Sequence, residues 1–118
     1  LAFIGMEKDD DSAAADKLLH KVLSYRVFAD AEGKMNLGLK DVGGELLLVS
    51  QFTLAASTSK GLRPSFSSAM PPSQAEILYG ELLAKARVGY DKVQSGVFAA
   101  DMQIALENNG PVTFMLQS

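Results

Sequence analysis

The most constraining feature of this sequence is an uninterrupted apolar run at residues 46–49, Leu-Leu-Leu-Val, within a stretch that reads as extended over residues 45–54. A strand with one solvated face alternates apolar and polar residues, whereas a strand buried on both faces is apolar throughout. The run therefore predicts a buried strand. Any fold for this chain must place other elements over it.

Two amphipathic stretches can cover that strand as helices. Ser12 follows three aspartates and can cap the first helix, and the acids suit the positive end of its dipole. Ser73 and Glu76 fit the capping box S-x-x-E of the second helix, which Gly89 can end. Each stretch carries one apolar stripe at helical spacing: Ala15, Leu18, Leu19, Val22 and Leu23 in the first, and Ala75, Leu78, Tyr79, Leu82, Leu83 and Ala86 in the second.

Further strands are predicted near both ends of the chain. The apolar residues 1–6 read as a strand, residues 102–106 alternate, and residues 112–116 form a closing strand after a turn. We therefore expect an α+β fold with two helices packed on one face of a mixed sheet. The other face can curl on itself, meet a partner subunit, or meet strands that precede Leu1.

Composition limits the class of protein. The 118 residues indicate a single domain, residues 1–118, with an ordinary globular balance of 47% apolar and 21% charged residues. Cysteine is absent, which excludes disulfides and thiolate zinc sites and fits a reducing cytoplasm. A net charge of −3 disfavours a general polyanion binder but allows a protein that binds only the end of a nucleic acid.

No stretch approaches the roughly 20 apolar residues of a membrane span. Because the chain starts without Met and inside a strand, we expect residues ahead of Leu1 to be missing.

The polar residues contain no common catalytic or metal motif. His20, the only histidine, falls on the polar side of the first helix, so a surface position is favoured and a Ser-His-Asp triad is disfavoured. Asp9, Asp10 and Asp11 lack the spacing and the glycine turn of a calcium loop. We expect them to be a solvated lead-in to the helix, and we expect no metal site.

Three other groups of residues allow two interpretations each. Residues 50–53, Ser-Gln-Phe-Thr, follow the buried strand, where sites often gather, but Thr and Phe are also ordinary strand residues. The Gly-Pro pair at 110–111 is either a simple turn or, in its cis form, a fixed pair of carbonyl acceptors for an ammonium group. Lys60 and Arg63, with Phe66 nearby, can meet a phosphate and stack on a base, although exposed loop charges are common.

Two separated motifs stand out: residues 50–54 read Ser-Gln-Phe-Thr-Leu, and residues 108–113 fit Asn-x-Gly-Pro-Val-Thr. Together they resemble the two signatures of the D-aminoacyl-tRNA deacylase family. Motifs of five and six positions are far more specific than a lone Gly-Pro, and the likeness covers nearly the whole chain in the family's order. It continues through Tyr25-Arg26-Val27-Phe28, Gly33-Lys34-Met35-Asn36, Arg63-Pro64-Ser65-Phe66 and Gly96-Val97-Phe98-Ala99-Ala100-Asp101-Met102.

The resemblance implies a homodimeric ester hydrolase that needs no cofactor. Enzymes of this family cut the bond between a D-amino acid, or glycine, and the 3′ end of tRNA, which makes aminoacylated tRNA the expected partner. The resemblance also implies a barrel-like sheet, to which a further pair of strands ahead of Leu1 contributes. Two rival interpretations remain: a paralogous deacylase that removes a mischarged L-amino acid, and a non-catalytic nucleic-acid-binding or dimerising module.

Carried onto this sequence, the first motif implies that Ser50, Gln51, Phe52 and Thr53 form the catalytic group. The backbone N–H groups of Phe52 and Thr53 would stabilise the oxyanion. Either Thr53 is the nucleophile or the ribose 2′-hydroxyl of the tRNA activates water. We favour the second alternative, because the sequence offers Thr53 no dedicated base.

The second motif implies that Gly110 and Pro111, joined by a cis bond, enter the active site of the other subunit. Their carbonyl groups would hold the substrate's amino group, so that an L side chain would point into a wall. Asn108 and Phe98 are expected to bind substrate with them. From charge and loop position alone, we expect phosphate contacts with the tRNA at Lys60, Arg63 and Lys85.

Overall fold

The central strand of the fold has a neighbour on each of its edges. In the computed structural model, which describes residues 1–118, β4 (Leu46–Ser50) pairs in parallel with β1 (Ala2–Ile4) on one side and with β5 (Val93–Ser95) on the other. The residues Leu48 and Val49 are 0% and 2% exposed. The structure therefore confirms the buried strand predicted from the apolar run, and the opening strand as well.

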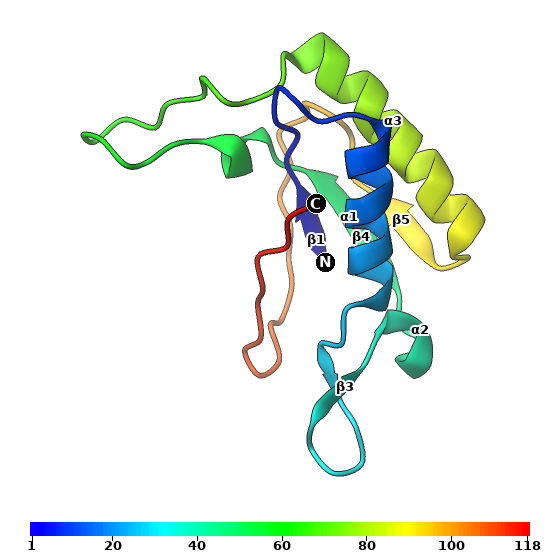
Figure 1. The fold of residues 1–118 in the computed structure, drawn as a ribbon. Helices are drawn as coiled ribbons and strands as arrows, with labels where there is room; N and C mark the ends of the chain where they lie inside the picture. Colours follow the sequence, from blue (N-terminus) through cyan, green and yellow to red (C-terminus); the bar gives the residue numbers. More distant parts are fainter.

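Two helices, α1 (Ser12–Ser24) and α3 (Pro72–Gly89), lie side by side against the sheet (Figure 1). The Tyr79 hydroxyl on α3 donates a hydrogen bond to the Leu48 carbonyl oxygen at 3.1 Å, which ties that helix to the central strand. No helix in the structure has both the length and the apolar character needed to cross a bilayer. The predicted helical stripes join the sheet in one core: Ile4, Met6, Ala15, Leu19, Leu23, Leu39, Leu46, Leu48, Met70, Ala75, Leu78, Tyr79, Leu82 and Ala86.

Both helices begin differently from the sequence prediction. The cap of α1 is Asp11 rather than Ser12, because Asp11 Oδ1 accepts a hydrogen bond from the Ala14 N–H at 2.8 Å. Ser12 is already helical, and its hydroxyl donates to a glutamate on α3. α3 begins at Pro72 with no side-chain cap, so the capping box at residues 73–76 does not form. Proline suits the first helical turn, where its missing N–H would have had no acceptor.

A second sheet projects beyond the end of α1 (Figure 1). It consists of β2 (Phe28–Ala29) and β3 (Met35–Leu37), which pair antiparallel. The chain then enters α2 (Leu39–Val42), a single helical turn that ends at Gly43 with φ of 63°. β3, α2 and β5 were not predicted, because each is only three or four residues long and lies among polar residues, so it shows no apolar run or period.

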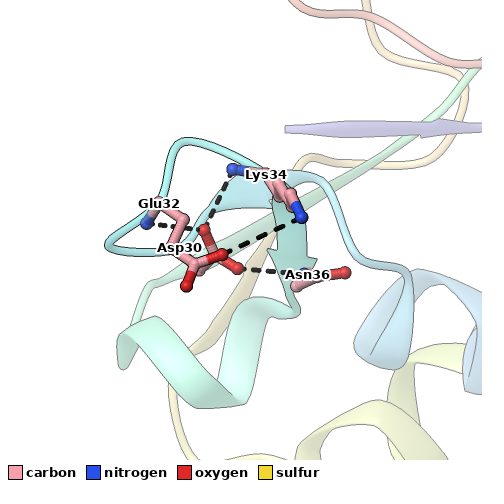
Figure 2. A network of polar contacts seen from close by, with 4 residues as sticks. All are labelled: Asp30, Glu32, Lys34 and Asn36. Atoms are coloured by element: carbon pink, nitrogen blue, oxygen red, sulfur yellow. Dashed lines mark hydrogen bonds and ion pairs between the residues drawn. The ribbon is translucent and has the colours of Figure 1, made fainter.

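Asp30 organises the turn between β2 and β3 (Figure 2). Its carboxylate accepts hydrogen bonds from the backbone N–H groups of Glu32 and Lys34 and from the Asn36 side chain, each at 2.9 Å. The bond from Asn36, followed by the backbone bonds, lowers the pKa of Asp30 below its ordinary value, because these donors favour the ionised carboxylate. These hydrogen bonds thus stabilise the hairpin of β2 and β3, which lies outside the core.

Residues 101–118 are extended but belong to no sheet. They make no backbone-to-backbone hydrogen bond, either to one another or to the rest of the chain. The strands predicted at residues 102–106 and 112–116 are therefore wrong. An alternating pattern forms a strand only where a neighbouring backbone pairs with it, and the structure places no such neighbour beside this segment.

This C-terminal segment runs out to a turn and back as two stretches, orange and red in Figure 1. Lys21 Nζ holds it by donating to the Gln117 carbonyl oxygen at 2.6 Å, and the rings of Tyr25 and Phe114 lie 6.1 Å apart. No strand joins β1 to β5, so both sheets are open. The molecule is a mixed α/β domain, and the barrel-like sheet expected from the resemblance is not present in the single chain.

Leu82 and Ile77 give a matched test of the core, because both lie on α3 but only Leu82 is buried. Leu82 is 1% exposed, and Ile77 is 67% exposed. We expect Leu82→Ala to lower the free energy of unfolding by about 2–5 kcal/mol, since it leaves a cavity, and Ile77→Ala to lower it by less than about 1 kcal/mol. Urea denaturation followed by circular dichroism measures both. Equal losses would contradict the assignment of the inner face of α3.

Candidate active site

The carboxyl ends of the three parallel strands meet at one edge of the sheet. Ile4, Ser50 and Ser95 are the last residues of β1, β4 and β5, and Ile4 is paired with Ser50. Loops that leave this edge of a parallel sheet commonly carry functional residues. The residues expected to be catalytic begin here, at the end of the central strand.

A single 3-10 turn, η1 (Phe52–Ala55), follows β4, so the strand ends earlier than predicted. The Gln51 N–H donates to the Ile4 carbonyl oxygen at 2.7 Å. The next backbone N–H groups, those of Phe52 and Thr53, have no acceptor within the chain, as is usual at the start of a helical turn. Both residues are exposed, so two adjacent donors are open to a ligand.

Gly5 makes room for this turn. A Cβ at Gly5 would lie 2.9 Å from Leu54 Cβ and 3.1 Å from the Gln51 carbonyl oxygen. A side chain there would displace η1, so the position of the two donors depends on this glycine. Gly5 was not predicted as a functional residue, although a glycine inside a predicted strand, here residues 1–6, is a known signal of close backbone approach.

The Thr53 hydroxyl has a hydrogen-bond donor beside it rather than a base. Gln51 Nε2 donates to Thr53 Oγ1 at 2.6 Å, and no carboxylate or imidazole is hydrogen-bonded to Thr53. An amide N–H cannot accept the proton that a nucleophilic threonine must lose. His20 lies exposed on α1. The geometry thus gives Thr53 no partner for nucleophilic attack.

Phe98 lies beyond the same edge, in the loop that follows β5. It is half-buried, and its ring lies 6.0 Å from that of Tyr79. Burial raises the pKa of the Tyr79 hydroxyl above its ordinary value, so this group stays protonated and donates to Leu48. Tyr79 therefore has a structural role, whereas Phe98 belongs to the loops of the candidate site.

Gly110 and Pro111 form the tip of the C-terminal segment, and their peptide bond is cis. Asn108 closes this turn: its Nδ2 donates to Thr113 Oγ1 at 2.9 Å, and its Oδ1 accepts from the Val112 N–H at 3.3 Å. In Figure 1 the turn lies well away from η1. Within one chain, the structure does not bring the two motifs together.

Residues 57–65 project as a loop beside η1 (Figure 1), and we call this loop the arm. Its two ends are joined by reciprocal backbone hydrogen bonds between Ser57 and Ser65, at 2.8 and 2.9 Å. The arm therefore leaves the body from a fixed base.

The charge around the arm has one sign. No acidic residue occurs between Glu45 and Glu76, and the only charged side chains of that stretch are Lys60 and Arg63. Both are exposed, and neither forms an ion pair. Lys85 differs, because it lies on α3 and its Nζ donates to an α1 aspartate at 2.6 Å.

Two open hollows of the surface lie away from the candidate site. One lies between the start of α1 and α3, and the other lies beside residues 7–10 and 67–68. Neither is lined by residues 50–53 or 108–111. No cluster of His, Asp and Glu in the chain could hold a metal ion. The candidate site of the single chain is thus an open edge of backbone donors.

Sequence comparisons with known families and proteins agree with one another. A family model described as D-Tyr-tRNA(Tyr) deacylase matches residues 1–117. A protein named D-aminoacyl-tRNA deacylase from Stutzerimonas stutzeri (strain A1501) is 63% identical over 118 residues, which cover 100% of this chain and 81% of that protein. Its namesake from Cellvibrio japonicus (strain Ueda107) is 57% identical over 117 residues, which cover 99% and 80% of the two chains.

Solved structures show the same fold. One named c-Myc DNA Unwinding Element Binding Protein has a TM-score of 0.92 at 38% identity, with 98% of this chain and 79% of that chain covered. Another, described as a probable eukaryotic D-amino acid tRNA deacylase, has a TM-score of 0.65 at 20% identity, with 84% and 74% covered. At that identity the second likeness concerns the fold alone.

Proposed function

The chain belongs to the D-Tyr-tRNA(Tyr) deacylase family, and on this basis we propose that it hydrolyses the ester that joins a D-amino acid, or glycine, to the 3′ end of tRNA. The observation that carries the proposal is 57–63% identity, over essentially the whole chain, to proteins named for this activity. The reaction keeps D-amino acids out of translation, and we place it in the cytoplasm. It needs no cofactor.

The free backbone donors suit ester hydrolysis. The ester carbonyl oxygen accepts hydrogen bonds from the N–H groups of Phe52 and Thr53, and these bonds strengthen as the oxygen gains negative charge. Water adds to the carbonyl carbon, the bond to the ribose oxygen breaks, and the proton lost by the water passes to that leaving oxygen. The ribose 2′-hydroxyl activates the water, because Gln51 leaves the Thr53 hydroxyl without a base. Ser50, at the end of β4, completes the catalytic group.

In this proposal the enzyme is a homodimer with shared sites. The exposed turn of Gly110 and Pro111 lies away from η1 of its own chain, so it enters the site of a second copy. There its carbonyl oxygens hold the ammonium group of the substrate, and Asn108 keeps the turn closed. Phe98 lines the pocket beside the substrate. With the ammonium group and the ester both fixed, an L side chain would point into the pocket wall.

Exposed groups of the single chain favour such a partner. The C-terminal segment has unpaired backbone donors and acceptors, which readily pair with another strand. Pairing of further strands with these free edges would complete a barrel-like sheet. Apolar side chains in this segment and at the start of the chain are exposed as well: Leu1, Phe3, Leu106, Phe114 and Met115.

We further propose that Lys60 and Arg63 contact phosphates near the 3′ end of the tRNA. The stretch without acidic residues places positive charge beside the site, although the whole chain carries a net charge of −3. Few contacts are enough to hold the tip of a nucleic acid, and they imply a weak dependence of affinity on salt. Lys85 is the third candidate, and it must leave its aspartate partner to take part.

One comparison favours a second function. The similar structure at 38% identity is named as a protein that binds a DNA unwinding element. A non-catalytic nucleic-acid-binding module would explain that likeness but not the higher identity to the deacylases. A deacylase specific for L-amino acids would use the same scaffold with a different Gly-Pro geometry. A single assay separates the three functions.

We expect the purified protein to hydrolyse D-tyrosyl-tRNA and glycyl-tRNA and to prefer D- over L-tyrosyl-tRNA by roughly 100-fold or more, because a misplaced ester carbonyl misses the backbone donors. Release of the amino acid from each charged tRNA measures this preference. A preference for the L substrate would identify the paralogous activity. Nucleic-acid binding without hydrolysis would identify the non-catalytic module.

Thr53→Val tests the role of the hydroxyl. We expect kcat/KM for D-tyrosyl-tRNA to stay within about ten-fold of the unsubstituted protein, whereas removal of a nucleophile typically costs on the order of 10⁴-fold or more. Valine keeps the shape of the side chain and the backbone N–H. Complete loss of activity in a folded Thr53→Val protein, together with a trapped acyl-enzyme in the unsubstituted one, would overturn this assignment.

A matched pair at position 52 tests the donors in the same assay. Proline suits the first position of η1, and the preceding Gln51, with φ of −144° and ψ of 87°, lies outside the helical region that a following proline disfavours. Phe52→Pro removes the N–H and is expected to lower kcat by about 10²–10³-fold. Phe52→Leu keeps the N–H and serves as the control for the lost ring. Equal kcat values for the two variants would argue against the backbone oxyanion site.

Gly110→Val tests the tip of the C-terminal turn. Gly110 has φ of 130°, and a Cβ there would lie 2.8 Å from Val112 Cγ2, so a side chain must displace the turn. We expect hydrolysis of D-tyrosyl-tRNA to fall by roughly 100-fold, because displaced carbonyl groups no longer position the ammonium group. Gly80→Val is the control, since a Cβ at this exposed position on α3 meets nothing within 4 Å. Unchanged rates in Gly110→Val with both D and L substrates would contradict the role of the turn.

A further inference from the structure

Two exposed aromatic rings meet beside the candidate site and outside the core. The ring centroids of Phe52 and Phe66 are 5.1 Å apart with the planes tilted by 50°, and the residues are 60% and 39% exposed. We call this pair the aromatic platform. Much of its ring surface faces solvent, and exposed rings of this kind are the usual surface on which unpaired bases stack.

The aromatic platform connects the site to the arm. Phe52 carries one of the two free N–H groups, whereas Phe66 directly follows the arm and is held there by the Ala69 N–H, which donates to its carbonyl oxygen at 3.0 Å. Phe98 belongs to a different loop and packs on Tyr79. In the proposed function, the terminal nucleoside, which carries the ester, lies at Thr53 and Phe98. Because Phe52 belongs to η1 and Phe66 follows the base of the arm, the contact between their rings joins the candidate site to the arm.

The charge on the arm indicates which class of ligand binds at the aromatic platform. Lys60 and Arg63 are exposed and form no ion pair, and no acidic residue lies between Glu45 and Glu76. An RNA chain that leaves the site in this direction brings its next phosphates to the two cations. Its next base then reaches the rings of Phe52 and Phe66. An apolar partner would not need the cations, so charge complementarity favours a single-stranded nucleic acid.

We propose that Phe52 and Phe66 stack on the base that precedes the terminal adenosine of the tRNA, while Lys60 and Arg63 hold the adjoining phosphates. This inference rests on the proposed function and names a part of the substrate beyond the reacting nucleotide. Stacking on an aromatic ring tolerates every base. The platform therefore adds affinity for the 3′ end without selecting among tRNAs.

Substrates of increasing length test the proposal. The D-tyrosyl ester of adenosine has no second base, and the D-tyrosyl ester of the dinucleotide CpA has one. The ratio of their kcat/KM values is the gain from the second nucleotide. We expect Phe66→Leu to lower this gain about 5- to 100-fold, through KM rather than kcat. Phe66→Trp keeps an aromatic face and is expected to restore the gain.

Phe28→Leu is the matched control, because Phe28 is 37% exposed and lies on β2, away from the arm. It is expected to keep the full gain. The proposal is overturned if the gain survives Phe66→Leu, or if that substitution slows hydrolysis of the adenosine ester as much as that of the CpA ester. If the unsubstituted protein hydrolyses neither ester nor D-tyrosyl-tRNA, the proposed function itself is wrong, and so is the base-stacking role inferred for the platform.

Discussion

The burial of β4 is the constraint on which the rest of the structure depends. Leu48 has no exposed surface, and the Tyr79 hydroxyl donates to its carbonyl oxygen, so α3 is fixed to the central strand by packing and by a polar contact. β1 and β5 pair with β4 in parallel. Their carboxyl ends therefore meet at one edge, and the two free backbone donors lie there. The packing that holds β4 in the core therefore also fixes the position of the two donors.

Elements whose signal lies within their own residues could be predicted from the sequence. The central strand has a continuous apolar run, and the two long helices have apolar stripes at helical spacing. The strands at residues 102–106 and 112–116 could not be judged in this way, because alternation shows which side chains would be buried but not whether a neighbouring backbone is available. The start of α1 could not be predicted exactly either, because two adjacent residues can cap it, and the cap is Asp11 rather than Ser12.

The candidate site could be located through its motifs but not built from them. Phe52 and Thr53 favour a strand by composition, yet the chain turns into η1 and leaves their N–H groups free. That turn depends on the close approach of Gly5, which is distant in sequence. The separation of the two motifs within one chain is likewise a property of the whole fold (Figure 1). Patterns along the sequence report composition, whereas these features arise from contacts between segments.

The reliance on main-chain N–H groups has a consequence for acidity. A hydrolase that uses a histidine base loses activity as its imidazole becomes protonated near neutrality. In the proposed site, the donors of Phe52 and Thr53 and the Gln51 amide do not titrate in that range. The ionisable participant is the α-amino group of the aminoacyl ester itself. Such an enzyme keeps its own chemistry intact when the cell acidifies, and only the charge of its substrate changes.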